Sequence, residues 1–141
     1  GKYWMIKLGT GAMIATAITL HATGAAARQA EPAICAVEQA IVCAPFDACE
    51  RSLPGAVNLP VLMRVDPAAK VILNRLEDGT ERRSEVHSIT ETENTVTLQG
   101  IDEGRPWLMQ IERGTGRFSV SSAYPTEAFV AFGVCSTSLL K

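Results

Sequence analysis

The segment that decides the fold is Asn94–Arg113, NTVTLQGIDEGRPWLMQIER. In its first half Val96 and Leu98 face one way and threonines the other, and in its second half Trp107 and Met109 share a face. A period of two residues is that of a strand with one buried side. The letters DEGRP between the halves are typical of a turn, so the segment predicts two antiparallel strands joined by a short link.

Short apolar segments of this kind recur along the chain and are separated by turn residues. Strands are predicted at residues 37–43, 61–65, 71–76, 83–90, 94–101, 107–113, 117–123 and 127–135. No helical segment separates them, which excludes parallel βαβ units. We therefore expect an all-β fold, an antiparallel meander of seven or eight strands closed into a small barrel or sandwich.

The first and last of these segments have features of their own. Residues 37–43 also fit a helix, because Ile34, Val37 and Ile41 share a helical face. Residues 127–135 are apolar on both faces, which predicts a place at the centre or the closure of the sheet.

The N-terminus has the layout of a secretory signal peptide. Lys2 and Lys7 precede the apolar run Leu8–Leu20, and small residues including Ala25 and Ala27 follow it. This order predicts cleavage after Ala27 and a periplasmic or secreted bacterial protein.

The alternative for this segment is a retained anchor helix, which would be the chain's one contact with a membrane. The expected organisation is residues 1–27 as signal peptide or anchor helix, 28–34 as a flexible lead and 35–141 as a single disulfide-stapled β domain. With 13 Lys and Arg against 15 Asp and Glu, the chain lacks the basic face that nucleic-acid binding requires.

The four cysteines all follow the predicted cleavage site. An even number of thiols in an exported chain indicates disulfides, and three pairings are possible. We expect Cys35 to pair with Cys43 and Cys49 with Cys135, because the second bridge would tie the irregular N-terminal region to the last strand. The spacings match neither a zinc site nor a Cys-x-x-Cys redox centre, so no metal or cofactor is predicted.

Candidate chemistry is sparse. His87 is the single histidine after residue 27, and the carboxylate pairs, such as Asp102-Glu103, are interpreted as solvated turn or strand-edge residues. A serine nucleophile would need a positioned base, and no nucleophile elbow or phosphate loop occurs. No catalytic residue is therefore predicted.

The residues expected to contact a ligand or partner are few. The long segment Pro45–Pro60, with three prolines and a glycine, is predicted to be an ordered loop with one helical turn, and ordered loops often carry function. It presents Phe46 and Asp47. Trp107, in the core or at a barrel mouth, and His87, on a strand, complete the set.

Three runs in the chain resemble a group of small exported β-domain proteins of alphaproteobacteria. These are CERSLPGAVNLPVLMRVD from Cys49, LQGIDEGRPWLMQIERGTGRFSV from Leu98 and FVAFGVCS from Phe129. The resemblance implies export and a single β domain, and it carries no catalytic residue across. We expect a non-catalytic binding or interaction module for a small apolar ligand or another envelope protein. A small hydrolase using carboxylates or His87, or an inhibitor of a secreted hydrolase, is the alternative.

Overall fold

The structure, a computed structural model, describes Gly11 and residues 32–136. The predicted signal peptide, its helix and its cleavage site lie outside these residues. The described part contains ten strands and one 3₁₀ helix, η1. In chain order they are β1 (Ala33–Cys43), β2 (Glu50–Ser52), η1 (Pro54–Val57), β3 (Leu62–Asp66), β4 (Val71–Arg75), β5 (Glu81–Glu85), β6 (Ser88–Glu91), β7 (Thr95–Asp102), β8 (Arg105–Glu112), β9 (Arg117–Tyr124) and β10 (Glu127–Cys135).

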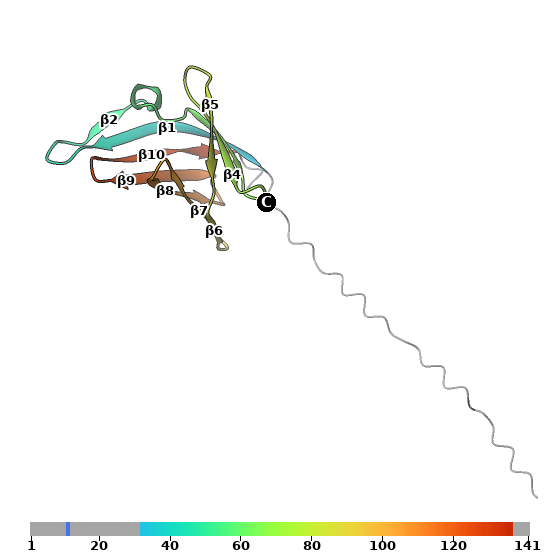
Figure 1. Ribbon diagram of the computed structural model, residues 1–141. Helices are drawn as coiled ribbons and strands as arrows, with labels where there is room; N and C mark the ends of the chain where they lie inside the picture. Colours follow the sequence, from blue (N-terminus) through green and yellow to red (C-terminus); the bar gives the residue numbers. More distant parts are fainter. Residues whose placement is uncertain (1–10, 12–31, 137–141) are drawn as a thin grey trace, which may run out of the picture.

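The strands form one antiparallel sheet in the order β5-β4-β3-β1-β10-β9-β8-β7-β6, with β2 pairing separately on β1. The sheet curls into a half-barrel (Figure 1). The predicted all-β, antiparallel fold is therefore confirmed, although the sheet has more strands than expected and is neither a closed barrel nor a sandwich. β10 lies in the middle of the order, as its apolar composition predicts.

The two ends of the sheet meet at one point. The Val86 amide donates a hydrogen bond to the Lys70 carbonyl beside β4, whereas the next amide, that of His87, donates to Gln99 on β7. The chain therefore crosses here from one edge of the sheet to the other. This crossing divides the predicted strand 83–90 into β5 and β6, which the residue pattern alone does not reveal.

One end of the half-barrel, which we call the floor, is filled by apolar side chains. Its fully buried residues come from strands that are far apart in sequence, so the floor joins the whole sheet. They include Ala33, Cys35, Val65, Val96, Leu98 and Ile111. Burial of these side chains is the main driving force for folding, at roughly 1.5–3 kcal/mol for each large one.

The N-terminal part of the domain departs from the expected boundaries. β1 begins at Ala33, inside the range expected to be a flexible lead, because Ala33 is fully buried and pairs with Val65 on β3. β1 is a strand throughout, and its helical alternative is wrong. In the predicted loop Pro45–Pro60, the expected helical turn is η1, but β2 forms a hairpin with β1.

That hairpin overturns the expected disulfide pairing. The bridges are Cys35–Cys135, with Cα atoms 3.9 Å apart, and Cys43–Cys49, with Cα atoms 4.2 Å apart. The first joins directly opposed residues of β1 and β10, and the second lies at the tip of the β1–β2 hairpin. Both pairs follow from strand register, which brings each cysteine opposite its partner.

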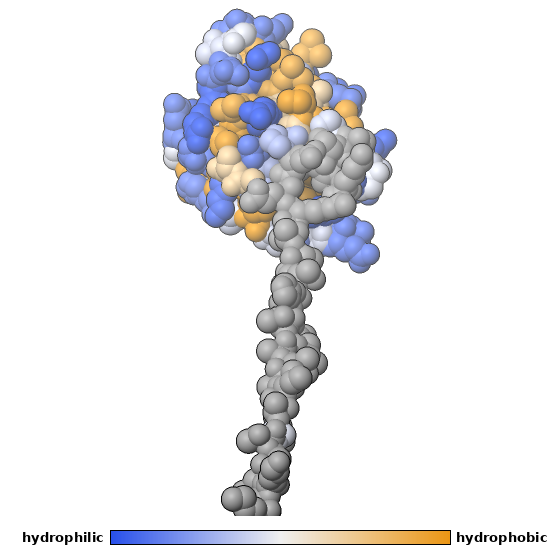
Figure 2. Space-filling model, turned by 90° about the vertical axis from the view of Figure 1, so that its right-hand side faces the viewer, coloured by the Kyte–Doolittle hydropathy of each residue, from blue (hydrophilic) through white to orange (hydrophobic). Residues whose placement is uncertain are grey.

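The outer face of the central strands also carries apolar side chains. Phe132 and Val134 on β10 are 44% and 39% exposed, and Ile34 and Leu62 on the neighbouring β1 and β3 are exposed as well. Figure 2 views the molecule from the side at which β1 begins and shows apolar residues in orange among hydrophilic ones in blue. β10 is therefore central without being buried on both faces.

Candidate binding site at the open end of the half-barrel

The end of the half-barrel opposite the floor encloses a cavity of about 750 Å³, which we call the lumen. Strands β1, β3–β5 and β7–β10 contribute residues to it, and Asn58, Leu59 and Pro60 border it after η1. Its open side, the mouth, lies beside the turn between β7 and β8. The inward face of the sheet is therefore filled by side chains at the floor and lines a cavity at the other end.

One wall of the lumen is apolar. It is formed by inward positions of β1, β3, β9 and β10 together with the segment after η1. Its residues are Val37, Val42, Val57, Leu59, Pro60, Met63, Val120, Phe129 and Ala131. The alternation of side chains along each strand places the residues of β1, β3, β9 and β10 in this list on the inward face.

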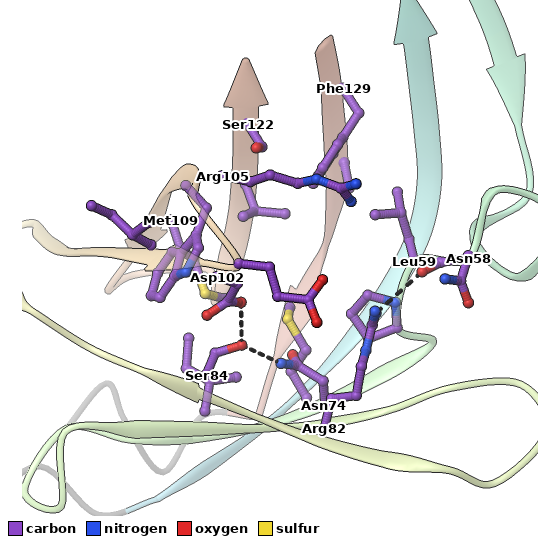
Figure 3. A pocket seen from close by; sticks show the side chains of 18 of the residues that line it. Asn58, Leu59, Asn74, Arg82, Ser84, Asp102, Arg105, Met109, Ser122 and Phe129 are labelled. Atoms are coloured by element: carbon purple, nitrogen blue, oxygen red, sulfur yellow. Dashed lines mark hydrogen bonds between the residues drawn. The ribbon is translucent and has the colours of Figure 1, made fainter. Parts of the chain in front are cut away.

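The facing wall carries a chain of hydrogen bonds that we call the clasp, made by Asn74, Ser84 and Asp102. Asn74 Nδ2 donates to Ser84 Oγ at 2.7 Å, and Ser84 Oγ donates to Asp102 Oδ2 at 2.6 Å (Figure 3). Asn74 and Ser84 are buried and Asp102 is half-buried. Because Ser84 is on the edge strand β5 and Asp102 is on β7, next to the other edge strand β6, the clasp connects opposite sides of the open sheet.

Charged and aromatic side chains surround the mouth. An Arg82 guanidinium nitrogen donates to the Asn58 carbonyl at 3.2 Å, and the Arg105 guanidinium lies 4.9 Å from the centre of the Tyr124 ring. The Tyr124 hydroxyl donates to Glu127 at 2.6 Å, and this hydrogen bond raises the pKa of the tyrosine. In Figure 3, Arg105 extends across the mouth towards Phe129.

Trp107 is held in the lumen wall by an unusually close approach of the backbone. A Cβ atom added at Gly100 would lie 2.4 Å from Trp107 Cζ2 and 2.5 Å from the Glu85 carbonyl oxygen. Glycine therefore lets the indole lie against β7 where β7 meets β5. Trp107 Nε1 is buried without a hydrogen-bond partner among the described residues.

The structure separates the four predicted contact residues into two places. Trp107 and His87 both line the lumen, with His87 exposed. Phe46 and Asp47 lie instead in the Cys43–Cys49 loop, outside the lumen lining. Two of the four residues therefore lie in the lumen and two at a separate surface, so the structure does not bring the four into one site.

The Cys43–Cys49 loop presents Phe46 to solvent. The Asp47 amide donates to the Ala44 carbonyl at 3.2 Å, so residues 44–47 form a turn with Pro45 second and Phe46 third. Phe46 has a φ of 65°, the left-handed conformation that this position of a type II turn requires and that glycine adopts most easily. Its side chain is 111% exposed relative to the reference state.

The clasp was missed at the sequence level. Asp102 was interpreted as a solvated turn carboxylate, but it accepts a hydrogen bond from a buried hydroxyl. A usable signal was present at Asn74 alone, which shares the inward face of the apolar strand β4 with Ile72; β5, with the sequence ERRSE, gives no such signal for Ser84. A polar residue at an inward position of an apolar strand indicates a buried hydrogen bond or a site.

Other classes of site find little support in the described part of the chain. Residues 32–136 contain no group of three or more His, Cys, Asp or Glu that could hold a metal ion. Within the same residues no helix has the length and apolar character to cross a membrane.

Comparison with family models, with curated proteins and with solved structures gave no match for this chain.

Proposed function

We propose that the chain is an exported, non-catalytic binding module whose lumen holds a small molecule with one apolar and one hydrogen-bonding side. The observation that carries this proposal is the contrast between the two walls of the lumen. One wall is aliphatic and aromatic, and the other presents the clasp and the charged mouth. The sequence analysis expected a small apolar ligand, whereas this proposal specifies an amphipathic one.

The size of the lumen supports a small ligand. Sites for drug-sized molecules usually measure about 300–1,000 Å³ and combine a mainly apolar lining with a few placed polar groups. The lumen, at about 750 Å³, has that size and that kind of lining. Two disulfides are compatible with an oxidising compartment and support the proposed export.

The alternative of a hydrolase is less well supported. Ser84 donates its hydroxyl hydrogen to Asp102 and accepts a hydrogen bond from Asn74. Among the described residues, no histidine side chain is hydrogen-bonded to the clasp. A serine nucleophile is normally activated by such a base. Loss of a hydrolytic activity in His87→Ala and Asp102→Ala, with folding intact, would restore the hydrolase hypothesis.

A second candidate function is docking on another protein through the Cys43–Cys49 loop. The observation that favours it is Phe46, an exposed aromatic residue in a conformation that glycine would adopt at lower cost. Exposed aromatic anchors on rigid loops are frequent hot spots of protein interfaces. Inhibition of a secreted hydrolase is one form that such docking could take.

Saturation-transfer difference NMR with a library of neutral small molecules tests the lumen as the binding site. Val42 lines the lumen near the mouth, whereas its neighbour Ile41 on β1 faces outward. We expect Val42→Trp to abolish binding by filling the lumen and Ile41→Trp to retain it. Equal binding by both variants would show that ligands bind elsewhere.

A further inference from the structure

The charges around the lumen nearly balance. Three arginines, Arg82, Arg83 and Arg105, face four carboxylates, those of Glu85, Asp102, Glu103 and Glu127. Arg83 and Glu85 neutralise each other in an ion pair of 2.6 Å. An anionic ligand would therefore meet the remaining carboxylates, and a cationic ligand would meet two guanidinium groups. A neutral ligand avoids both repulsions.

The polar wall also offers many hydrogen-bonding groups to a neutral ligand. Asp102 uses Oδ2 to accept from Ser84, which leaves Oδ1 as an acceptor. Asn74 donates through Nδ2, which leaves its carbonyl oxygen as an acceptor. Arg105 forms no ion pair within residues 32–136 and keeps its donors. Covering these groups with a purely apolar molecule would leave them desolvated and unpaired, which is costly.

The apolar wall faces this polar wall across the lumen. In Figure 3, Phe129 lies opposite Asn74 and Ser84. The indole of Trp107 lies against β7, and one face of the Tyr124 ring is covered by Arg105. An occupant must therefore place C–H groups against Phe129 while donors and acceptors on its other side meet Asn74, Asp102 and Arg105.

A ring sugar combines these properties in one molecule. Its hydroxyls are each donor and acceptor, it has no charge, and the C–H groups on one ring face pack against aromatic side chains. We propose that the lumen is a binding site for a neutral saccharide. This inference rests on the proposed function and specifies the ligand class for the same site.

Isothermal titration calorimetry of the full chain with N-acetylglucosamine, maltose and cellobiose tests the proposal. We expect at least one of them to bind, with an affinity that changes little between low and high salt because the ligand is neutral. Phe129→Ala should weaken binding at least tenfold, whereas Phe132→Ala, on the outer face of the same strand, should leave it unchanged. Arg105→Gln should weaken it similarly, with Arg117→Gln, outside the lumen lining, as its control.

Octan-1-ol, a neutral and mainly apolar probe, separates the two levels of the proposal. Binding of octan-1-ol that Val42→Trp abolishes, with no heat from any of the three saccharides, would overturn the saccharide inference and leave the lumen as a binding site. If neither octan-1-ol nor a saccharide binds, both proposals fail. Saccharide binding that Phe129→Ala and Arg105→Gln leave unchanged would also overturn the inference.

Discussion

The floor and the mouth of the half-barrel are built from the same strands but have opposite chemistry. On β4 the inward residue is Ile72 towards the floor and Asn74 towards the mouth; likewise Val86, directly after β5, belongs to the floor and Ser84, on β5, to the mouth. The backbone is a regular antiparallel ladder at both levels. In this sheet, inward side chains only two residues apart therefore separate a packed core from a hydrogen-bonded cavity wall.

The largest expected difference concerns the two disulfides. Cys35–Cys135 joins residues 100 positions apart in the floor, and Cys43–Cys49 joins residues six apart at the hairpin tip. In the chain-entropy model their removal costs about 4–5 and about 2 kcal/mol, respectively. Urea unfolding of the two double Cys→Ser variants measures this difference. Equal losses of stability would contradict the expectation that the bridge in the floor stabilises the domain more than the bridge at the hairpin tip.

A floor side chain should come next. Leu98 is fully buried, so Leu98→Ala should lower the free energy of unfolding by about 2–5 kcal/mol through lost burial and a new cavity. Met63→Leu keeps a similar volume at the lumen side of the core and should cost less than about 1.5 kcal/mol. Thermal unfolding of both variants checks this order, and a mild effect of Leu98→Ala would mean that the floor is loosely packed.

The clasp should matter less for stability than the floor. Ser84→Ala removes the hydroxyl that joins Asn74 to Asp102 and leaves both groups without that partner, at a cost of about 1–3 kcal/mol. Ser121→Ala, at an exposed outward position of β9, is the matched control and should change stability by less than about 0.5 kcal/mol. Identical urea midpoints for the two variants would show that the hydrogen bonds of the clasp do not stabilise the fold.

The smallest expected effect is a gain. Phe46→Gly should relieve the left-handed backbone strain, about 1–2 kcal/mol, and lose part of that gain, about 0.5–1 kcal/mol, to the greater freedom of glycine in the unfolded chain. The net stabilisation is about 0–1.5 kcal/mol. Leu53 is also exposed but has a φ of −73°, so Leu53→Gly should destabilise instead. Differential scanning calorimetry measures the unfolding temperature of both variants. If both substitutions lower it, the backbone at Phe46 is not strained.

The strands of the half-barrel could be predicted well because each has its own period of two. Val96, Leu98 and Met109 are buried where the alternation places them. The disulfide pairing could not be predicted, because it depends on which strands are neighbours in the sheet. Cys135 lies opposite Cys35 because the last strand, β10, pairs with the first strand, β1. Register between distant strands leaves no local trace in the sequence.

The site was predictable only in part, for a related reason. Trp107 stands out as a large aromatic residue on an alternating strand, and it does line the lumen. Asn74 stands out as a polar residue on the apolar strand β4, but Ser84 acquires meaning only when β5 is brought against β7, because every residue of β5 is polar and resembles a surface position. The seam between the ends of the sheet is a tertiary feature, and the clasp depends on it.

The most direct test of the central claim is a two-dimensional ¹H–¹⁵N NMR map of the full chain titrated in turn with N-acetylglucosamine, maltose and cellobiose. We expect at least one of the three to cause shifts confined to the residues that line the lumen, above all the Trp107 indole and the amides of Ser84 and Asp102, with the amides of Val96 and Ile111 in the floor unchanged. Shifts confined to the floor, to the outer face or to the Cys43–Cys49 loop, or no shifts at all, would contradict it.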